Sequence, residues 1–151
     1  MGGNKRMKKG FTLIEMLIVV AVIAILIGIA LPRFRGMQEE GLIAQAKGEL
    51  RTLQTAVESY YLHNSSAYPA DGSLSDITSS TPEIVSAVPD DVFNIGTAYA
   101  YDLSANGNYY AIWSVGIGGN GSAVANDAGT VTETNGSSCI FVSNAARDSA
   151  P

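Results

Sequence analysis

Hydrophobic and polar positions divide the chain into three successive parts. Residues 11–31 contain one charged residue and are otherwise almost entirely apolar, whereas residues 33–63 place apolar side chains three or four positions apart. From about residue 98 onward, short runs alternate apolar and polar side chains. A run of about 20 apolar residues can cross a hydrocarbon core as a helix, and the two later periods are typical of an amphipathic helix and of strands. The pattern therefore predicts a membrane-spanning helix, a second helical segment and a β-rich region.

The second helical segment carries one apolar stripe. Its members recur at intervals of three and four residues: Ile43, Ala46, Leu50, Leu53, Val57 and Tyr60. Such spacing places them on one side of a helix, where they can face a core. Glu49 and Glu58 fall outside the stripe and are expected to point elsewhere. Pro32 separates the two helical segments and removes one backbone hydrogen bond, so we expect it to kink a single long helix.

The region after the helix is predicted to be a loop. The helix is expected to end near His63, before a cluster of turn-forming residues and the pair Tyr68-Pro69. Residues 70–91 are then expected to form a loop with one short helix. Thr81 would cap this helix and Pro82 would occupy its first position.

Two hairpins are predicted in the β-rich region. The first joins residues 99–103 to residues 109–115, and the second joins residues 129–134 to residues 138–142, each across a turn that contains Asn-Gly. We expect these strands to form one antiparallel sheet of three or four strands that lies across the helix stripe. Residues 144–151 hold too few apolar side chains to pack and are expected to form a flexible tail.

The predicted fold class is α+β, with a long kinked N-terminal helix packed against a small antiparallel β-sheet head. The first half of that helix would span a membrane. The expected organisation is a basic leader at 1–10, a transmembrane and assembly helix at 11–32, an amphipathic helix of the head at 33–63, a loop and sheet at 64–143, and the tail at 144–151.

Four cations lie ahead of the apolar run. Lys5, Arg6, Lys8 and Lys9 are on its N-terminal side, which orients the leader toward the cytoplasm and the chain from Pro32 onward toward the exported side. A secretory signal peptide is the competing interpretation. However, the apolar run is longer than a signal peptide's 7–15 residues, and no small-residue cleavage site follows it. The small residue, Gly10, stands in front of the run, so any cut is expected there.

Glu15 is the one charged residue within the apolar run. On insertion scales an acidic residue at the centre of a membrane helix costs roughly 2.5 to 3.5 kcal/mol, so such a residue is a candidate functional site with a partner to be named. The alternative is a carboxylate near the interface that is solvated or protonated.

The residues Gly10-Phe11-Thr12-Leu13-Ile14-Glu15 resemble the processing site of type IV prepilins and of the pseudopilins of type II secretion systems. The resemblance implies that a prepilin peptidase cuts between Gly10 and Phe11 and methylates the new amino group of Phe11. It also implies that Glu15 and Phe11 act in assembly. The amine of Phe11 in one subunit would lie against the Glu15 carboxylate of another, which lowers the cost of both charges.

This resemblance implies a filament subunit with several partners. They are copies of the chain itself, prepilin peptidase, an inner-membrane assembly platform, minor pilins, and membrane lipid before assembly. The expected location is the inner membrane, as a single-pass protein with a cytoplasmic N-terminus, and then a periplasmic or extracellular filament.

The β-rich region is similar to the head of the major pseudopilin of type II secretion. The similar segments are residues 89–93, 98–101 and 109–116. That family often binds calcium in the following loop, but here residues 116–121 lack the expected aspartate. Oxygen donors would be limited to Asn120, Asn126 and Asp127, whereas calcium takes 6–8 oxygen ligands. No cofactor is expected, with calcium near Asn120 and Asp127 as the one candidate.

The most favoured function is therefore the major pseudopilin of a type II secretion system. The alternatives are a type IV pilin of a surface pilus, acting in adhesion, motility or DNA uptake, and a membrane-anchored binding module that does not polymerise.

Composition narrows the function classes further. The net charge is −5, and removing the four leader cations leaves −9, which disfavours binding to nucleic acid. Cys139 is the single cysteine, so an intramolecular disulfide is excluded. Gly116, Gly118 and Gly121 fit a dinucleotide-binding pattern, but that site also needs a helix after the glycines, so we expect a turn. No catalytic constellation is apparent, and an enzyme is not expected.

Overall fold

The computed structural model describes residues 10–70, 72, 74–134 and 139–147. The chain forms two compact units, residues 1–38 and residues 39–151. Most of the predicted leader, residues 1–9, lies outside the described residues.

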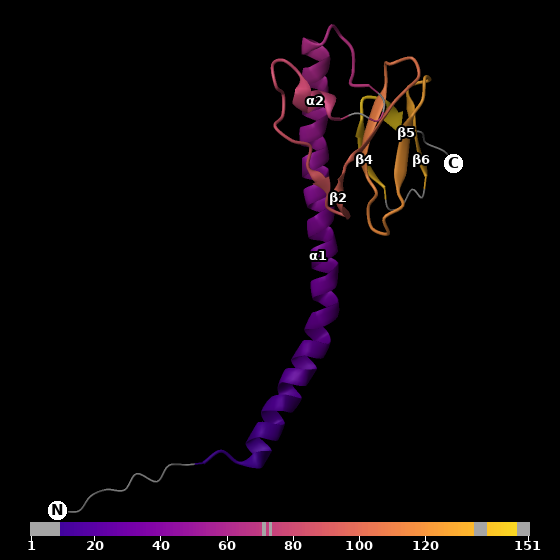
Figure 1. The fold of residues 1–151 in the computed structure, drawn as a ribbon. Helices are drawn as coiled ribbons and strands as arrows, with labels where there is room; N and C mark the ends of the chain where they lie inside the picture. Colours follow the sequence, from indigo (N-terminus) through magenta and orange to yellow (C-terminus); the bar gives the residue numbers. More distant parts are fainter. Residues whose placement is uncertain (1–9, 71, 73, 135–138, 148–151) are drawn as a thin grey trace, which may run out of the picture. The chain divides into compact units, whose positions relative to one another are not determined.

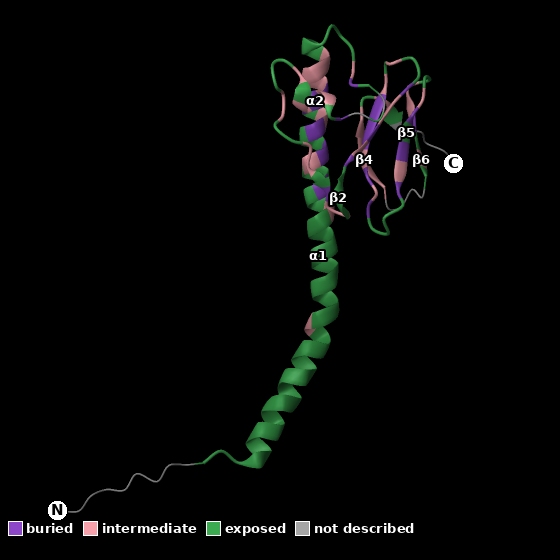
Figure 2. Cartoon of the chain, viewed as in Figure 1, coloured by how far each residue is buried: buried purple, intermediate pink, exposed green. Residues whose placement is uncertain are grey.

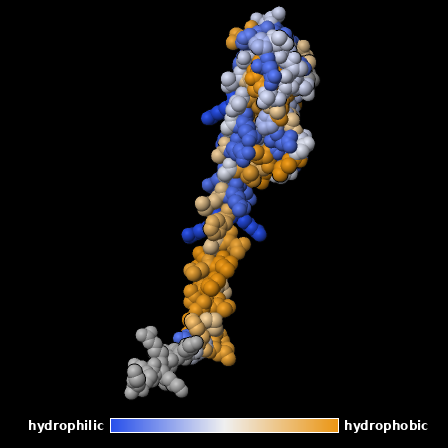
Figure 3. All heavy atoms as spheres, turned by 60° about the vertical axis from the view of Figure 1, so that its left-hand side comes forward, coloured by the Kyte–Doolittle hydropathy of each residue, from blue (hydrophilic) through white to orange (hydrophobic). Residues whose placement is uncertain are grey.

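The first unit consists of the early part of helix α1, which runs from Leu13 to His63 (Figure 1). Nearly every side chain of this part is exposed, as the green colour in Figure 2 shows. From Leu13 to Leu31 these exposed side chains are apolar except for Glu15, and they form the orange surface of the helix in Figure 3. In the described part of the chain, α1 is the single helix that is long and apolar enough to cross a membrane. An apolar helix without a core of its own requires lipid or other helices around it.

Pro32 lies inside α1, and the helix continues on both sides of it. The predicted long N-terminal helix is therefore confirmed. The kink at Pro32 stays a prediction.

In the second unit, α1 supplies one side of a core. Its buried residues are Ala46, Leu50, Leu53, Ala56 and Val57, which confirms the predicted stripe and adds Ala56 to it. Four of them, Leu50, Leu53, Ala56 and Val57, pack with aromatic and aliphatic side chains of the head, namely Leu74, Ile77, Tyr99, Tyr101, Tyr110 and Ile112. The spacing of the stripe explains this packing, because residues three and four apart share one helix face.

The strands of the second unit form three small sheets (Figure 1). The first contains β1 (Asp90–Asp91) and β2 (Asn94–Ala98). The second has the order β3 (Ala100–Leu103), β4 (Tyr110–Ser114) and β7 (Ile140–Ser143). The third has the order β5 (Ser122–Ala125), β6 (Thr130–Thr134) and β8 (Ala146–Arg147).

Strand β4 is buried on both of its faces. Tyr110 and Ile112 belong to the core against α1, whereas Ala111, between them, belongs to a second cluster with Ala123, Ala125 and Val131 of the third sheet. Successive side chains of a strand point to opposite faces. The second unit is therefore layered, with the sheet β3-β4-β7 between α1 and the sheet β5-β6-β8.

The first predicted hairpin is confirmed and the second is wrong. β3 and β4 pair antiparallel, with Tyr101 opposite Ile112. However, β7 pairs with β4 rather than with β6. Ile140 and Val142 of β7 pack toward the α1 core, and Phe141 packs toward the second cluster. Because β7 has apolar side chains on both faces, it fits in the middle sheet, which is covered on both sides. β6 instead pairs with β5, whose small residues carry little β-propensity and gave no sequence signal.

The predicted position of the short helix is also corrected. The short helix α2 lies at Asp76–Ser79, not after Thr81, because Ile84, Val85 and Val88 pack against the core from a segment without helix.

The prediction of a flexible tail from residue 144 is wrong for residues 144–147. The Asn144 side chain accepts from Tyr110 N at 2.9 Å and donates to Asn108 O at 2.9 Å, and β8 pairs parallel with β6. Hydrogen bonds, together with the packing of Ala145 against the second cluster, hold residues 144–147 in place. The small number of apolar residues in this segment therefore did not reveal its order. Residues 148–151 lie outside the described residues.

Candidate functional site

Thr12 and Glu15 bond each other at the start of α1. Thr12 N and Thr12 Oγ1 each donate to Glu15 Oε2 at 2.8 Å, and Glu15 N donates to Thr12 Oγ1 at 3.3 Å. This is the reciprocal arrangement of a capping box, in which both ends of the first turn supply hydrogen-bond partners to each other. The Glu15 carboxylate also lies at the positive end of the helix dipole. The charged residue of the apolar run therefore has a structural partner within its own turn.

No role was expected of Thr12 from the sequence. A Thr-x-x-Glu spacing immediately before an apolar run is the known signal for such a box and would have identified it. One part of Glu15 remains available: among the described residues, no donor is paired with Glu15 Oε1. The capping box thus fixes the carboxylate through one oxygen and leaves the other free for a second donor.

Gly10 and Phe11 precede the helix. Both are exposed, and Phe11 keeps 79% of its surface open to solvent. The peptide bond between them lies in irregular backbone, because α1 begins only at Leu13. A peptidase can therefore reach this bond without unwinding a helix. Cleavage at this bond and methylation of Phe11 stay predictions.

Two of the oxygen donors proposed for calcium, Asn126 and Asp127, are already engaged in hydrogen bonds. Asp127 Oδ1 accepts from Asn106 N at 2.8 Å, and Asn126 Oδ1 accepts from Ala128 N and Thr130 N at 3.0 and 3.1 Å. Within the described residues, no group of three or more His, Cys, Asp or Glu side chains could hold a metal ion. A donor set whose one carboxylate, that of Asp127, already accepts from the Asn106 amide does not fit an ion that takes 6–8 oxygens.

The glycines at 116–121 lead from β4 through a turn into β5, so no helix follows them. The predicted turn is confirmed. A dinucleotide site needs a helix N-terminus at this point.

Two carboxylates of α1 face the head. Glu49 Oε2 accepts from Tyr99 OH at 2.6 Å, and Glu58 Oε1 accepts from Tyr110 OH at 2.7 Å. Burial, followed by the hydrogen bond and the negative charge of the neighbouring glutamate, raises the pKa of both tyrosines. The expectation that Glu49 and Glu58 point away from the head was wrong, because buried tyrosine hydroxyls need an acceptor and these carboxylates supply it.

The N-terminal segment is similar to segments of known proteins. A family model described as the prokaryotic N-terminal methylation motif matches residues 5–31, which include Gly10, Phe11 and Glu15. A fimbrial protein of Pseudomonas aeruginosa is 44% identical over 68 residues, which cover 42% of this chain and 44% of that protein. The chain is type IV pilin-like.

Two further relatives of this pilin-like chain differ in the systems they are named for. The type II secretion system core protein G of Pseudomonas aeruginosa is 33% identical over 67 residues, covering 44% of this chain and 46% of that protein. The type IV major pilin protein PilE of Neisseria gonorrhoeae is 35% identical over 75 residues, covering 50% and 44%. The chain thus spans less than half the length of these curated relatives. No solved structure gives a significant match.

Proposed function

We propose that this protein is the structural subunit of a type IV pilus-like filament. In this proposal prepilin peptidase cuts between Gly10 and Phe11 and methylates Phe11, and the mature chains polymerise through α1. The observation that carries the proposal is the position of Glu15: it is the one charged residue of the exposed apolar run at 11–31, and its carboxylate is fixed in the first turn of α1 beside the new N-terminus.

The physical basis is the exchange of lipid for other helices. The large apolar side chains of residues 13–31 are all exposed in the isolated chain, so they must be covered by a bilayer or by other copies. Moving the Phe11 amine of one copy to the Glu15 carboxylate of another neutralises two charges that would each be costly in an apolar bundle. Because amine and carboxylate partners come from different copies, the contact repeats head to tail and generates an open helix.

The finer proposal is the major pseudopilin of a type II secretion system, located in the inner membrane and then in a periplasmic filament. The similarity of the head segments and the match to core protein G support it. A surface pilin is the second candidate, supported by the higher identity to fimbrial protein. In both cases the partners would be an inner-membrane assembly platform and minor pilins, and the chain would act as a structural subunit rather than an enzyme.

The test is the mass of the native N-terminus together with the state of assembly. We expect the mature protein to begin with N-methylated Phe11 and to occur in filaments. A protein that keeps Met1 and stays monomeric in every envelope fraction overturns the proposal and supports a membrane-anchored binding module. Imaging sheared surface material then separates the two finer candidates, because long surface fibres are expected only of a pilin.

A further inference from the structure

The β1–β2 hairpin presents an isoleucine to solvent. After the end of α1, three large apolar side chains are exposed among the described residues: Ile95 at 89%, Val124 at 47% and Ile117 at 44%. Ile95 lies in β2, where all five residues are exposed, and in the part of the chain that the structure describes β2 pairs with β1 alone. An apolar side chain so far out of the fold adds nothing to the stability of its own chain.

A buried carboxylate holds this hairpin in place. Asp91 is 2% exposed, and its Oδ1 accepts from Phe93 N at 3.0 Å and from Ser114 Oγ at 2.7 Å. Its Oδ2 accepts from Val115 N at 2.8 Å, so the hairpin is tied to the end of β4. Asp90 adds a bond from Gly96 N at 3.1 Å. Ile95 is therefore presented by an ordered element, which reduces the entropy lost when a partner binds it.

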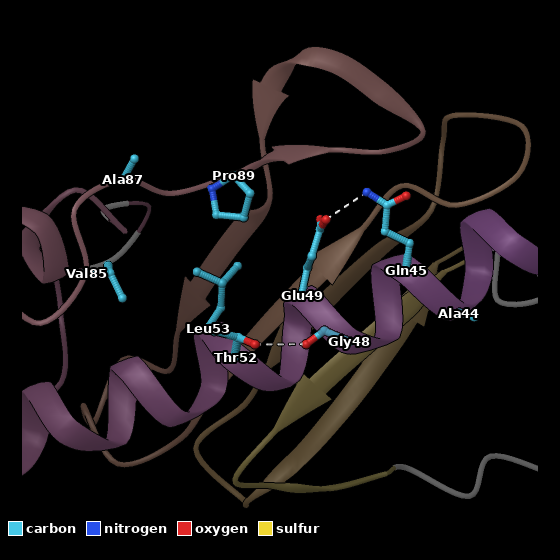
Figure 4. Close-up of a pocket in the computed structure, with 9 residues that line it drawn as sticks. All are labelled: Ala44, Gln45, Gly48, Glu49, Thr52, Leu53, Val85, Ala87 and Pro89. Carbon is cyan, nitrogen blue, oxygen red and sulfur yellow. Dashed lines mark hydrogen bonds between the residues drawn. The ribbon is translucent and has the colours of Figure 1, made fainter.

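The same unit contains an apolar groove beside α1. Gly48, Thr52 and Leu53 of α1 line one side, and Val85, Ala87 and Pro89 line the other, around a volume of about 290 Å³ (Figure 4). No atom lies within 4 Å of the position that a Gly48 Cβ would occupy, so the glycine leaves open space there. A second hollow continues along α1 from Thr52 to Ser59.

The polar groups of the groove are already paired. Thr52 Oγ1 donates to Gly48 O at 3.1 Å. Glu49 Oε1 accepts from Gln45 Nε2 at 2.9 Å, and its Oε2 is bonded to Tyr99 OH. These side chains need no polar ligand, so what the groove offers to an occupant is apolar contact.

We propose that Ile95 of one copy seats in this groove of the next copy along the filament. This inference rests on the proposed function, to which it adds a contact between heads. Ile95 and the groove belong to different surfaces of one chain. A contact between them in two copies is therefore heterologous and repeats without closing on itself.

Charge at the two surfaces also favours a second copy. Asp90 is exposed on the hairpin that carries Ile95. Arg51 is exposed on α1 and lies three positions after Gly48, which makes the two neighbours on the helix surface. Glu49 also lines the groove, but both of its oxygens are bonded within the chain, to Gln45 and Tyr99. The exposed Arg51 is therefore the charge that meets Asp90 of an incoming hairpin, and this opposite charge favours the pairing over a like-charged one.

Cross-linking tests the contact directly. Full-length protein carrying both Ile95→Cys and Gly48→Cys is assembled and oxidised, and each single variant serves as the control for pairing through Cys139. We expect a ladder of covalent oligomers from the double variant alone. Filaments that yield only monomers, or the same bands as the single variants, overturn the contact.

Ile95→Ser provides an independent test, with Val124→Ser on β5 as the matched control. Ile95 is exposed, so we expect an unchanged unfolding midpoint and normal N-terminal processing. Losing a buried isoleucine from a contact should raise the concentration needed for assembly by about tenfold to a hundredfold, and Val124→Ser should not. Assembly of Ile95→Ser like that of the wild type counts against the contact. If the wild type itself forms no filament, the proposed function fails, and this inference fails with it.

Discussion

Thr12 and Glu15 close the first turn of α1 on each other, with Thr12 N and Thr12 Oγ1 both 2.8 Å from one Glu15 oxygen. The carboxylate is therefore oriented before any second chain arrives. A group held in its productive position loses less entropy when its partner binds. The local cap and the proposed contact between subunits thus use the same side chain for two purposes.

Removing the Thr12 hydroxyl should loosen this turn. We expect Thr12→Val to destabilise the start of α1 by about 1 kcal/mol, the typical effect of losing an N-cap. Hydrogen exchange of the amides at residues 13–16, measured on the full chain in micelles, would show it as faster exchange. Thr12→Ser keeps the hydroxyl and is the control. Identical exchange in Thr12→Val and wild type would contradict a role for the cap.

Glu15 should be essential for assembly and dispensable for insertion. We expect Glu15→Ala and Glu15→Gln to be processed and membrane-inserted but unable to form filaments, because neither variant can neutralise the Phe11 amine. Electron microscopy and the mass of the N-terminus report the two properties separately. Glu40→Gln, which removes an exposed carboxylate elsewhere on α1, is the matched control. Normal filaments from Glu15→Ala would count decisively against the proposed pairing.

Pro32 should make α1 locally easier to open. It cannot donate a backbone hydrogen bond, so the carbonyl of Gly28 lacks its partner four residues along. We expect Pro32→Ala to slow amide exchange between residues 28 and 36, consistent with the roughly 3 kcal/mol difference between proline and alanine inside helices. Filaments from this variant should differ in structure or length distribution. Unchanged exchange and unchanged filaments would show that the proline has no such effect.

The bond between Tyr110 and Glu58 should stabilise the packing of α1 on the sheet. Tyr110→Phe removes the donor of a 2.7 Å bond to a carboxylate, and we expect it to lower the free energy of unfolding by about 1.5 kcal/mol. Denaturant unfolding followed by the fluorescence of Trp113, the single tryptophan, measures this change. Tyr109→Phe at the preceding position is the control, and an equal loss in both variants would refute the specific role of the bond.

Alkaline solution should weaken the head. Burial raises the pKa of Tyr68, Tyr99 and Tyr110, with the neighbouring glutamates adding to the effect. In the unfolded chain these tyrosines ionise near pH 10, whereas in the folded chain they keep their protons to higher pH. The stabilisation is therefore fully present below about pH 10 and is lost as pH rises above it, because the unfolded state then binds fewer protons.

This pH dependence can be measured by denaturant unfolding between pH 8 and 11.5, followed by far-ultraviolet circular dichroism. We expect the unfolding midpoint to fall above about pH 10, and to fall less steeply in Tyr110→Phe. A midpoint that is constant across the range would contradict the expectation.

The sequence by itself was sufficient for the long-helix architecture and the processing motif. Helix periodicity is a local property, so the stripe at Ala46, Leu50, Leu53 and Val57 could be identified from spacing alone, and the structure buries all four. The β3–β4 hairpin was equally predictable, because its turn and its aromatic strand are adjacent in the chain. The capping box was also readable from Thr-x-x-Glu.

Tertiary structure alone decided which strands meet and where charged side chains point. β7 pairs with β4 although residues 115–139 lie between the two strands, and strand pairing at such separation depends on the faces available for burial rather than on local pattern. Glu49 and Glu58 turn toward the head because buried tyrosine hydroxyls there require acceptors, which no helix period reveals. The groove beside Gly48 and the exposed Ile95 likewise exist only after distant segments pack. Local chemistry thus determines the helix and its ends, whereas burial between distant segments determines the surface of the head.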